Sequence, residues 1–119
     1  MTNSILTSVK KGVGGITELD EAFDDELIMH INSALAQLTQ LGVGPVTGFQ
    51  ISDKTATWQD FVGEDPRLNM IQIYVTCVVR MIFDPPTIGA VAQAYRDRIA
   101  ELEWRLNVQA ETPANPETD

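Results

Sequence analysis

Residues 70–106, MIQIYVTCVVRMIFDPPTIGAVAQAYRDRIAELEWRL, decide the fold, because they hold two helical patterns separated by an obligatory break. The break is Phe83-Asp84-Pro85-Pro86. A proline lacks a backbone N–H and its ring clashes with the preceding turn, so two adjacent prolines cannot lie inside a helix. We therefore predict that one helix ends near Asp84 and that the chain turns back into a second helix. Such a helical hairpin offers shape and surface, so the function should lie in what the protein binds.

The first helix of the hairpin is predicted over about 66–84. Asp65-Pro66 is a start signal, because a capping side chain precedes a proline that suits the first helical position. The apolar residues recur at helical spacing and leave a narrow polar stripe, which predicts a helix buried nearly all round. Its β-branched residues would also suit a strand, but strict alternation is absent and the run is longer than a typical strand. The apolar face holds Leu68, Ile71, Val75, Val78 and Ile82.

Shorter patterns precede this helix. Gly12 is expected to end a first helix, and a side chain in the acidic passage that follows is expected to cap a second one. A capping box of Thr57 and Asp60 predicts one helical turn. The expected elements are a helix over 3–11, an amphipathic helix that starts at Asp24 or Asp25 and runs to about Leu41, a projecting loop or short hairpin over 46–57, and a helical turn over 58–62.

The last helix is predicted from a cap at Thr87 to Leu106, with Ile88, Val91, Tyr95, Ile99 and Leu102 at helical spacing. Residues 108–119 have a polar, proline-containing composition that cannot bury enough apolar surface to offset the entropy of ordering, so we expect a disordered acidic tail. The fold class is therefore mainly α, a small helical bundle around a central buried helix. A single domain should cover residues 1–107.

Composition narrows the class of function. The chain has 119 residues, 44% of them hydrophobic, which suits one soluble globular domain. Its net charge of -9 disfavours sequence-independent attraction to nucleic acid or anionic lipid. The N-terminal residues do not resemble a signal peptide, and the longest apolar run is too short to span a bilayer. We expect no membrane passage.

No residue pattern indicates an enzyme, a metal site or a cofactor. His30 is the only histidine and lies one helical turn from Glu26, which suggests a surface ion pair rather than a catalytic dyad. Cys77 lies in the most apolar stretch and should be a buried structural thiol in a reducing compartment. The acids from Glu18 to Glu26 lack the register of a calcium-binding loop, and Gly12-x-Gly14-Gly15 lacks the lysine of a phosphate loop.

The residues as a set resemble the small head-tail connector (adaptor) proteins of long-tailed bacteriophages. No single block is diagnostic; the order and spacing of the blocks across about residues 5–107 carry the resemblance. The blocks are Ile5-Leu6 with Lys10-Lys11, Ile31-Asn32-Ser33 with Leu38 and Leu41-Gly42-Val43-Gly44, Trp58-x-Asp60-Phe61, Tyr74-Val75 with Val79-Arg80, Phe83-Asp84-Pro85-Pro86, and Glu101-Leu102-Glu103-Trp104-Arg105-Leu106.

This resemblance implies a structural virion protein without enzyme activity. It implies a ring of copies between the portal protein and the tail, which extends the DNA channel and offers a surface to the next connector or tail component. DNA would pass without specific binding. The location would be the virion, after assembly in the host cytoplasm.

Three sets of residues are candidates for partner binding. Glu18, Asp20, Glu21 and Asp24 could face either the channel or the basic Arg96 and Arg98 of a neighbouring copy. Phe49 and Ile51 in the projecting loop could reach a neighbour or the tail side by adding a strand. Trp104 and Arg105 precede the tail, where a segment from Glu103 onward could become ordered on the portal.

One alternative comes from another class. A small acidic regulatory or DNA-mimicking protein would also carry a large negative charge and would bind a basic groove on another protein. Such a protein would be a stable monomer or dimer with no tendency to form rings.

Overall fold

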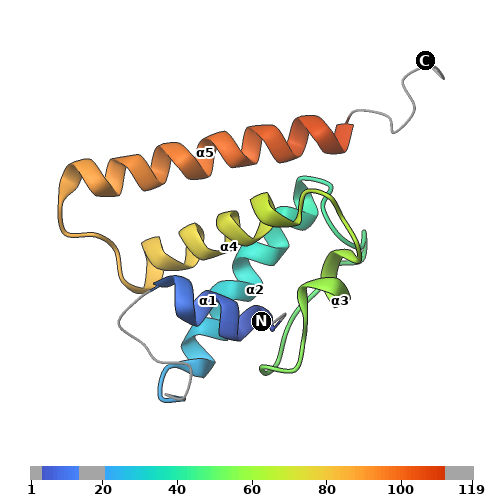
Figure 1. Cartoon of the computed structure of the whole chain (residues 1–119), viewed down its shortest axis with the longest axis horizontal. Coiled ribbons are helices and arrows are strands. Elements are labelled where there is room, and N and C mark those ends of the chain that lie inside the picture. Colours follow the sequence, from blue (N-terminus) through green and yellow to red (C-terminus); the bar gives the residue numbers. More distant parts are fainter. Residues whose placement is uncertain (1–3, 14–20, 112–119) are drawn as a thin grey trace.

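The computed structural model describes residues 4–13 and 21–111. Figure 1 shows a helical bundle with a long C-terminal helix lying along one side. Within the described residues no strand forms, and one isolated bridge joins Ser4 to Thr57. The mainly α prediction is confirmed. The helices are α1 (Ile5–Val13), α2 (Asp24–Gln40), α3 (Trp58–Val62), α4 (Leu68–Phe83) and α5 (Gly89–Glu111).

Helix α4 is the centre of the bundle, as expected, and it packs against α1, α2 and α5. Its burial is incomplete at its C-terminal end, where Ile82 is 49% exposed. The start differs from the prediction: α4 begins at Leu68 rather than Pro66. The Asp65 carboxylate accepts the backbone N–H of Arg67 (2.8 Å) and pairs with its guanidinium (2.7 Å), so these residues form a turn before the helix.

Helix α1 continues to Val13, so the prediction that Gly12 ends it is wrong. Gly12 instead lies against α4, where an added Cβ would overlap the Thr76 side chain. Close packing between two helices therefore explains this glycine better than a helix end does. The expected side-chain cap of α2 is also absent: Phe23 occupies the N-cap position without a side-chain hydrogen bond.

The segment between α2 and α3 packs on the bundle more closely than a projecting hairpin would. Asn32 of α2 accepts the backbone N–H of Ile51 (2.7 Å) and donates to its carbonyl (3.0 Å). Ile51 is only 4% exposed, and the Phe49 ring lies 5.2 Å from that of Phe61. The predicted capping box at the start of α3 is confirmed, with Thr57 at the N-cap.

Helix α5 begins at Gly89 and runs to Glu111, so helical structure reaches beyond the expected end at Leu106. It lies on α4 through one face, in which Leu102 and Leu106 are fully buried. Figure 1 shows that most of its circumference faces away from the bundle. A long helix held by one face leaves an extended surface for contact with other molecules.

Candidate interaction surfaces

The exposed face of α5 carries a small excess of positive charge. Its exposed charged residues up to Val108 are three arginines and two carboxylates. Glu101 pairs with both Arg98 (3.0 Å) and Arg105 (3.1 Å), and these contacts, the Arg98 hydrogen bond first, lower the pKa of Glu101. Arg96 donates to the neutral Gln93 (3.1 Å). The set consists of Arg96, Arg98, Arg105, Asp97 and Glu101.

Trp104, a candidate for partner binding, lies on this exposed helix. It is 68% exposed, and Val108, one helical turn further on, is 39% exposed. Tryptophan is enriched among the residues that contribute most to binding at protein interfaces, so Trp104 is a candidate contact residue. We refer to Trp104 and Val108 as the helix-end surface.

A second group of apolar residues lies where α4 turns into α5. Ile82 and Ile88 are 49% and 64% exposed. Phe23, before α2, is 42% exposed and contacts Phe83 edge to face, with ring centroids 5.4 Å apart. We refer to Phe23, Ile82, Phe83 and Ile88 as the turn surface. The sequence analysis did not identify these residues as a site, because the spacing of Ile82 and Ile88 placed both on apolar helix faces. Their closeness to the double proline is the one sequence signal that could have indicated their exposure.

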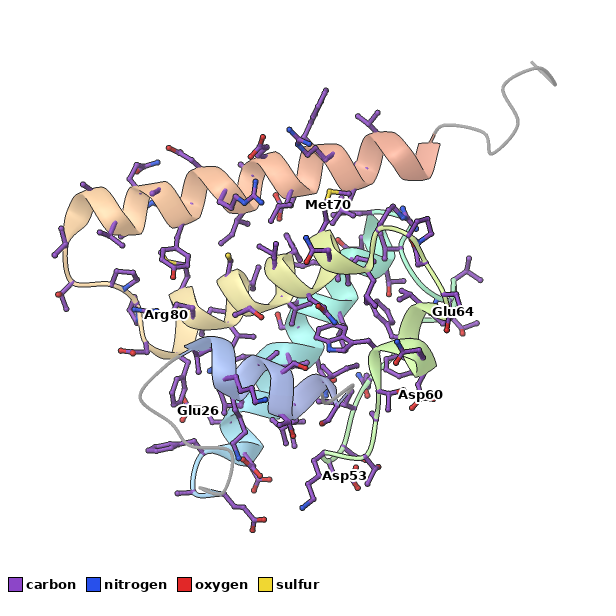
Figure 2. The ribbon with its side chains drawn as sticks, viewed as in Figure 1. Glu26, Asp53, Asp60, Glu64, Met70 and Arg80 are labelled. Atoms are coloured by element: carbon purple, nitrogen blue, oxygen red, sulfur yellow. The ribbon has the colours of Figure 1, made fainter. Side chains whose placement is uncertain are left out.

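The turn between α4 and α5 is held by Arg80. Its Nε donates to the Asp84 carbonyl (2.9 Å), and its guanidinium carbon lies 5.5 Å from the centroid of the Tyr95 ring. Figure 2 shows Arg80 near the end of α4, under the first part of α5. These contacts join the end of one helix to the start of the next and give the turn surface a defined shape.

The predicted acidic candidates divide into two groups. Glu18 and Asp20 lie outside the described residues, and Glu21 is exposed. Asp24 contacts Lys10 of α1 at 2.8 Å, and the Lys10 side chain is 3% exposed. The Asp24 carboxylate therefore holds the start of α2 against α1, which sets it apart from the exposed Glu21.

The two loop candidates lie inside the molecule rather than on a free strand. Ile51 is buried, and Asn32 already binds its backbone N–H and carbonyl. Phe49 is half-buried against Phe61. Strand addition through these residues would require Asn32 to release the loop. In contrast, Val46 on the same loop is 95% exposed.

The hollows of the surface are open and carry few ionisable groups. One hollow, of about 520 Å³, lies between α2 and the following loop. A smaller one of about 250 Å³ lies between α1, α4 and α5 and includes Cys77, whose thiol has a pKa raised mainly by burial. The predicted buried thiol and the His30–Glu26 pair (3.4 Å) are both confirmed. The larger hollow is lined by Asn32, Ala36, Thr39, Gln40, Thr47, Gly48, Phe49 and Gln50.

Across residues 4–13 and 21–111, no group of three or more histidine, cysteine or acidic side chains is placed to hold a metal ion. None of the helices in this part of the chain combines the length and apolar character that crossing a membrane requires.

Helices with exposed apolar and charged surfaces, as in the described part of this chain, are typical of proteins that bind other macromolecules. The comparisons define the family: a family model described as phage connector protein matches residues 5–113, so the chain belongs to the phage connector family. Comparisons with curated proteins and with solved structures gave no match. The family is structural rather than enzymatic, and membership indicates a virion protein at the connector that contacts other head or tail proteins.

Proposed function

We propose that copies of this chain form a ring between the portal protein and the tail. The ring extends the DNA channel and presents a surface to the next connector or tail component. The observation that carries the proposal is the family match across residues 5–113, which spans all five helices. The long exposed face of α5 supports it, because a ring subunit needs surfaces beyond those that close its own core.

The proposed channel allows DNA to pass without specific binding. A net charge of -9 opposes attachment to phosphates, which favours sliding over gripping. Acids near the start of α2 face either this channel or Arg96 and Arg98 of the adjacent copy. Since Asp24 pairs with Lys10, the proposal now rests on Glu18, Asp20 and Glu21.

The acidic contact is tested by charge reversal at Asp20 and Glu21, with Asp24 left intact. Asp20→Lys combined with Glu21→Lys should impair ring formation or lower the phage titre. Glu64→Lys is the matched control, because Figure 2 shows Glu64 beyond α3, at the end of the molecule opposite Arg80. If the double variant assembles as well as the Glu64→Lys control and gives the same phage titre, Asp20 and Glu21 do not contribute to ring contacts or to the channel.

The structure already places residues up to Glu111 in α5, so ordering on the portal, first expected from Glu103 onward, is now proposed only for residues 112–119. A polar segment that becomes ordered only on a partner can cover a large surface at moderate affinity. Because α5 reaches Glu111, removal of residues 112–119 leaves the described helix whole. The truncated protein should bind the portal more weakly than the full chain in a pull-down with purified portal. Equal binding would refute the contact.

The loop over 46–57 is proposed to face a neighbour or the tail side through its exposed part around Val46. A shorter loop that keeps Phe49 and Ile51 in place should leave the fold intact and weaken tail attachment. Normal tail attachment in complementation assays would count against this role.

Electron microscopy of the concentrated protein, alone and with the portal, tests the ring itself. Annular particles, or added density below the portal, are the expected result. A particle that stays a monomer or dimer in both conditions would contradict the ring and favour a small acidic protein that binds a basic groove.

A further inference from the structure

Helix α5 is held on its own chain mainly by one neighbour, α4, and mainly through its second half. Figure 1 shows α5 lying along α4 at one side of the bundle. Leu102 and Leu106 are fully buried, whereas Ala92 is the one buried residue in the preceding, described part of the helix. Two hollows of about 250 and 240 Å³ lie beside this first half, and both are lined by Cys77 of α4 and Tyr95 of α5. The first half of α5 is therefore loosely packed on α4.

The linker between α4 and α5, residues 84–88, does not by itself fix the direction of α5. The Asp84 N–H donates to the Arg80 carbonyl (3.0 Å), and after it residues 85–87 make no backbone hydrogen bond to any described residue. Two adjacent prolines favour an extended chain rather than a tight reversal. Arg80 bridges the linker, because its guanidinium also lies 5.5 Å from the centroid of the Tyr95 ring. The position of α5 thus depends on its contacts with α4.

A second copy of the chain offers the same contacts. Its α4 is identical, so Leu102 and Leu106 of one copy can be buried on the α4 of another. The Tyr74 hydroxyl, 2.8 Å from Glu103 Oε2 within one chain, can likewise meet Glu103 of another copy. Exchange of an identical element between copies needs no new complementary surface and is a low-cost route to association. The partner that fits the α5-binding face of α4 is therefore a second copy.

We propose that in the ring α5 of each copy packs on α4 of the next copy, an arrangement called α5 exchange below. The inference rests on the proposed ring and names the element that joins its subunits. Each copy gives one α5 and receives another, so the contact is heterologous and continues from copy to copy until the rotation closes.

Exchange also explains why assembly should depend on concentration. In dilute protein, the α4 of the same chain competes for α5 at a high effective concentration, so the closed monomer prevails. A high protein concentration, or copies gathered on the portal, favours contacts between chains. The linker does not oppose this change, because its residues 85–87 have no backbone hydrogen bonds to lose among the described residues.

A covalent lock between α2 and α5 tests the exchange. Gln37 Oε1 and Glu103 Oε2 both lie within hydrogen-bonding distance of the Tyr74 hydroxyl, so Gln37→Cys and Glu103→Cys place two thiols close together. A short bismaleimide, added to dilute protein, should link them within one chain. The locked protein should need a protein concentration about tenfold or more higher than the unlinked double variant to form rings, because its α5 cannot leave. The matched controls are the two single variants treated with the same reagent.

A second lock covers the case in which the first pair disturbs the Tyr74 contacts. Ala94→Cys and the native Cys77 line the hollow of about 240 Å³, and longer treatment with the reagent should link them without a change at Gln37 or Glu103. Circular dichroism checks that each variant is folded, and sedimentation velocity measures ring formation. Locked protein that forms rings as readily as its unlinked form would overturn the exchange.

Cross-linking after assembly shows which copy each α5 contacts. In rings of the Gln37→Cys and Glu103→Cys double variant, the bismaleimide should join neighbouring copies and give a ladder of covalent multimers. A mixture of the two single variants should stop at dimers. Wild-type protein, with only the buried Cys77, should give no ladder. Links within single chains, or dimers alone from the double variant, would overturn the exchange.

These experiments separate the exchange from the proposed function. Rings in which every α5 link stays within one chain would refute the exchange but leave the ring between portal and tail standing. Failure of the wild-type protein to form rings, both alone and with the portal, would refute both. A ladder from the double variant together with loss of rings on locking is the result expected from α5 exchange.

Discussion

Replacement of Tyr74 by phenylalanine should weaken the junction between α2, α4 and α5. The Tyr74 ring is fully buried, and its hydroxyl oxygen lies 2.7 Å from Gln37 Oε1 and 2.8 Å from Glu103 Oε2. The single hydroxyl proton can be donated to only one of these two acceptor oxygens at a time, and we take the charged Glu103 as its partner. Phenylalanine keeps the ring, so no cavity forms and the change removes only this hydrogen bond. This hydroxyl is the polar link by which the buried middle of α4 holds α5.

The expected loss in the free energy of unfolding follows from the partners of the Tyr74 hydroxyl. A hydrogen bond to a charged group contributes about 1.5–3 kcal/mol, and the lower half of that range applies because Glu103 is half-buried and regains water when the bond is lost. We therefore expect Tyr74→Phe to lower the free energy of unfolding by about 2 kcal/mol at pH 7. Urea denaturation measures this change.

The same site predicts a pH dependence with a definite sign. Burial first, and then Glu103, raise the pKa of Tyr74 well above its usual value of 10.0. The phenol therefore loses its proton in the unfolded chain before the folded one, and the stabilisation is present below pH 10 and decreases as pH rises. At pH 11 the loss amounts to about 1.4 kcal/mol. The difference between wild type and Tyr74→Phe should shrink from about 2 to about 0.6 kcal/mol.

The control is Tyr95→Phe, which removes a hydroxyl 3.5 Å from Arg80. Such a long contact is weak, so this variant should lose less than about 1 kcal/mol at pH 7 and keep the pH dependence that arises from Tyr74. If the Tyr74→Phe difference is the same at pH 7 and pH 11, the hydroxyl is not held between α2 and α5 and the reasoning is wrong.

Three further predictions concern other parts of the bundle. Gly12→Ala should lower the free energy of unfolding by about 1–3 kcal/mol, because the new methyl group overlaps Thr76 of α4; thermal denaturation measures it. Asn32→Ala should lower the free energy of unfolding, measured by urea denaturation, by about 1–3 kcal/mol, because the backbone N–H and carbonyl of Ile51 both lose their partner. The same variant should make the loop around Ile51 more sensitive to protease. Cys77 should react with a thiol reagent at pH 8 about tenfold or more slowly in the native protein than in urea, because burial restricts access and raises its pKa.

Each of these predictions has a control and a refuting result. Gly89→Ala meets no atom at the start of α5 and should be neutral or slightly stabilising; equal destabilisation by both glycine variants would argue against close contact of α1 with α4. Asn69→Ala removes an exposed amide and should have little effect. An Asn32 variant as stable as this control would mean that the loop does not depend on Asn32. Equal labelling of native and unfolded protein would contradict the burial of Cys77.

Local sequence signals were sufficient where one short segment determines its own conformation. The double proline at Pro85-Pro86 ended α4 near the expected residue, and the capping box at Thr57 marked the start of α3. The helical spacing of α2 and α5 was also sufficient to identify both helices. Trp104 lies off the apolar face of its helix, so its exposure too was predictable from spacing.

Signals that depend on a partner distant in sequence were misleading. Gly12 suggested a helix end, but its reason is the Thr76 side chain across the α1–α4 contact. Phe49 and Ile51 alternate with polar residues like an exposed strand, yet Asn32 and Phe61 hold them inward. Asp24 was grouped with the free acids because nothing in the nearby sequence indicates that Lys10 lies beside it.

The amino-acid sequence by itself determined that the protein is helical, where its hairpin breaks and which residue types lie at the centre, because propensity, capping and periodicity act within a few residues. Only the tertiary structure decided which of the remaining groups are available to partners. The packing of the helices leaves Ile82 and Ile88 exposed. It also brings Asp24 to Lys10 and Ile51 to Asn32, so these two residues are already used in contacts inside the chain. That depends on packing between distant segments, which no local pattern encodes.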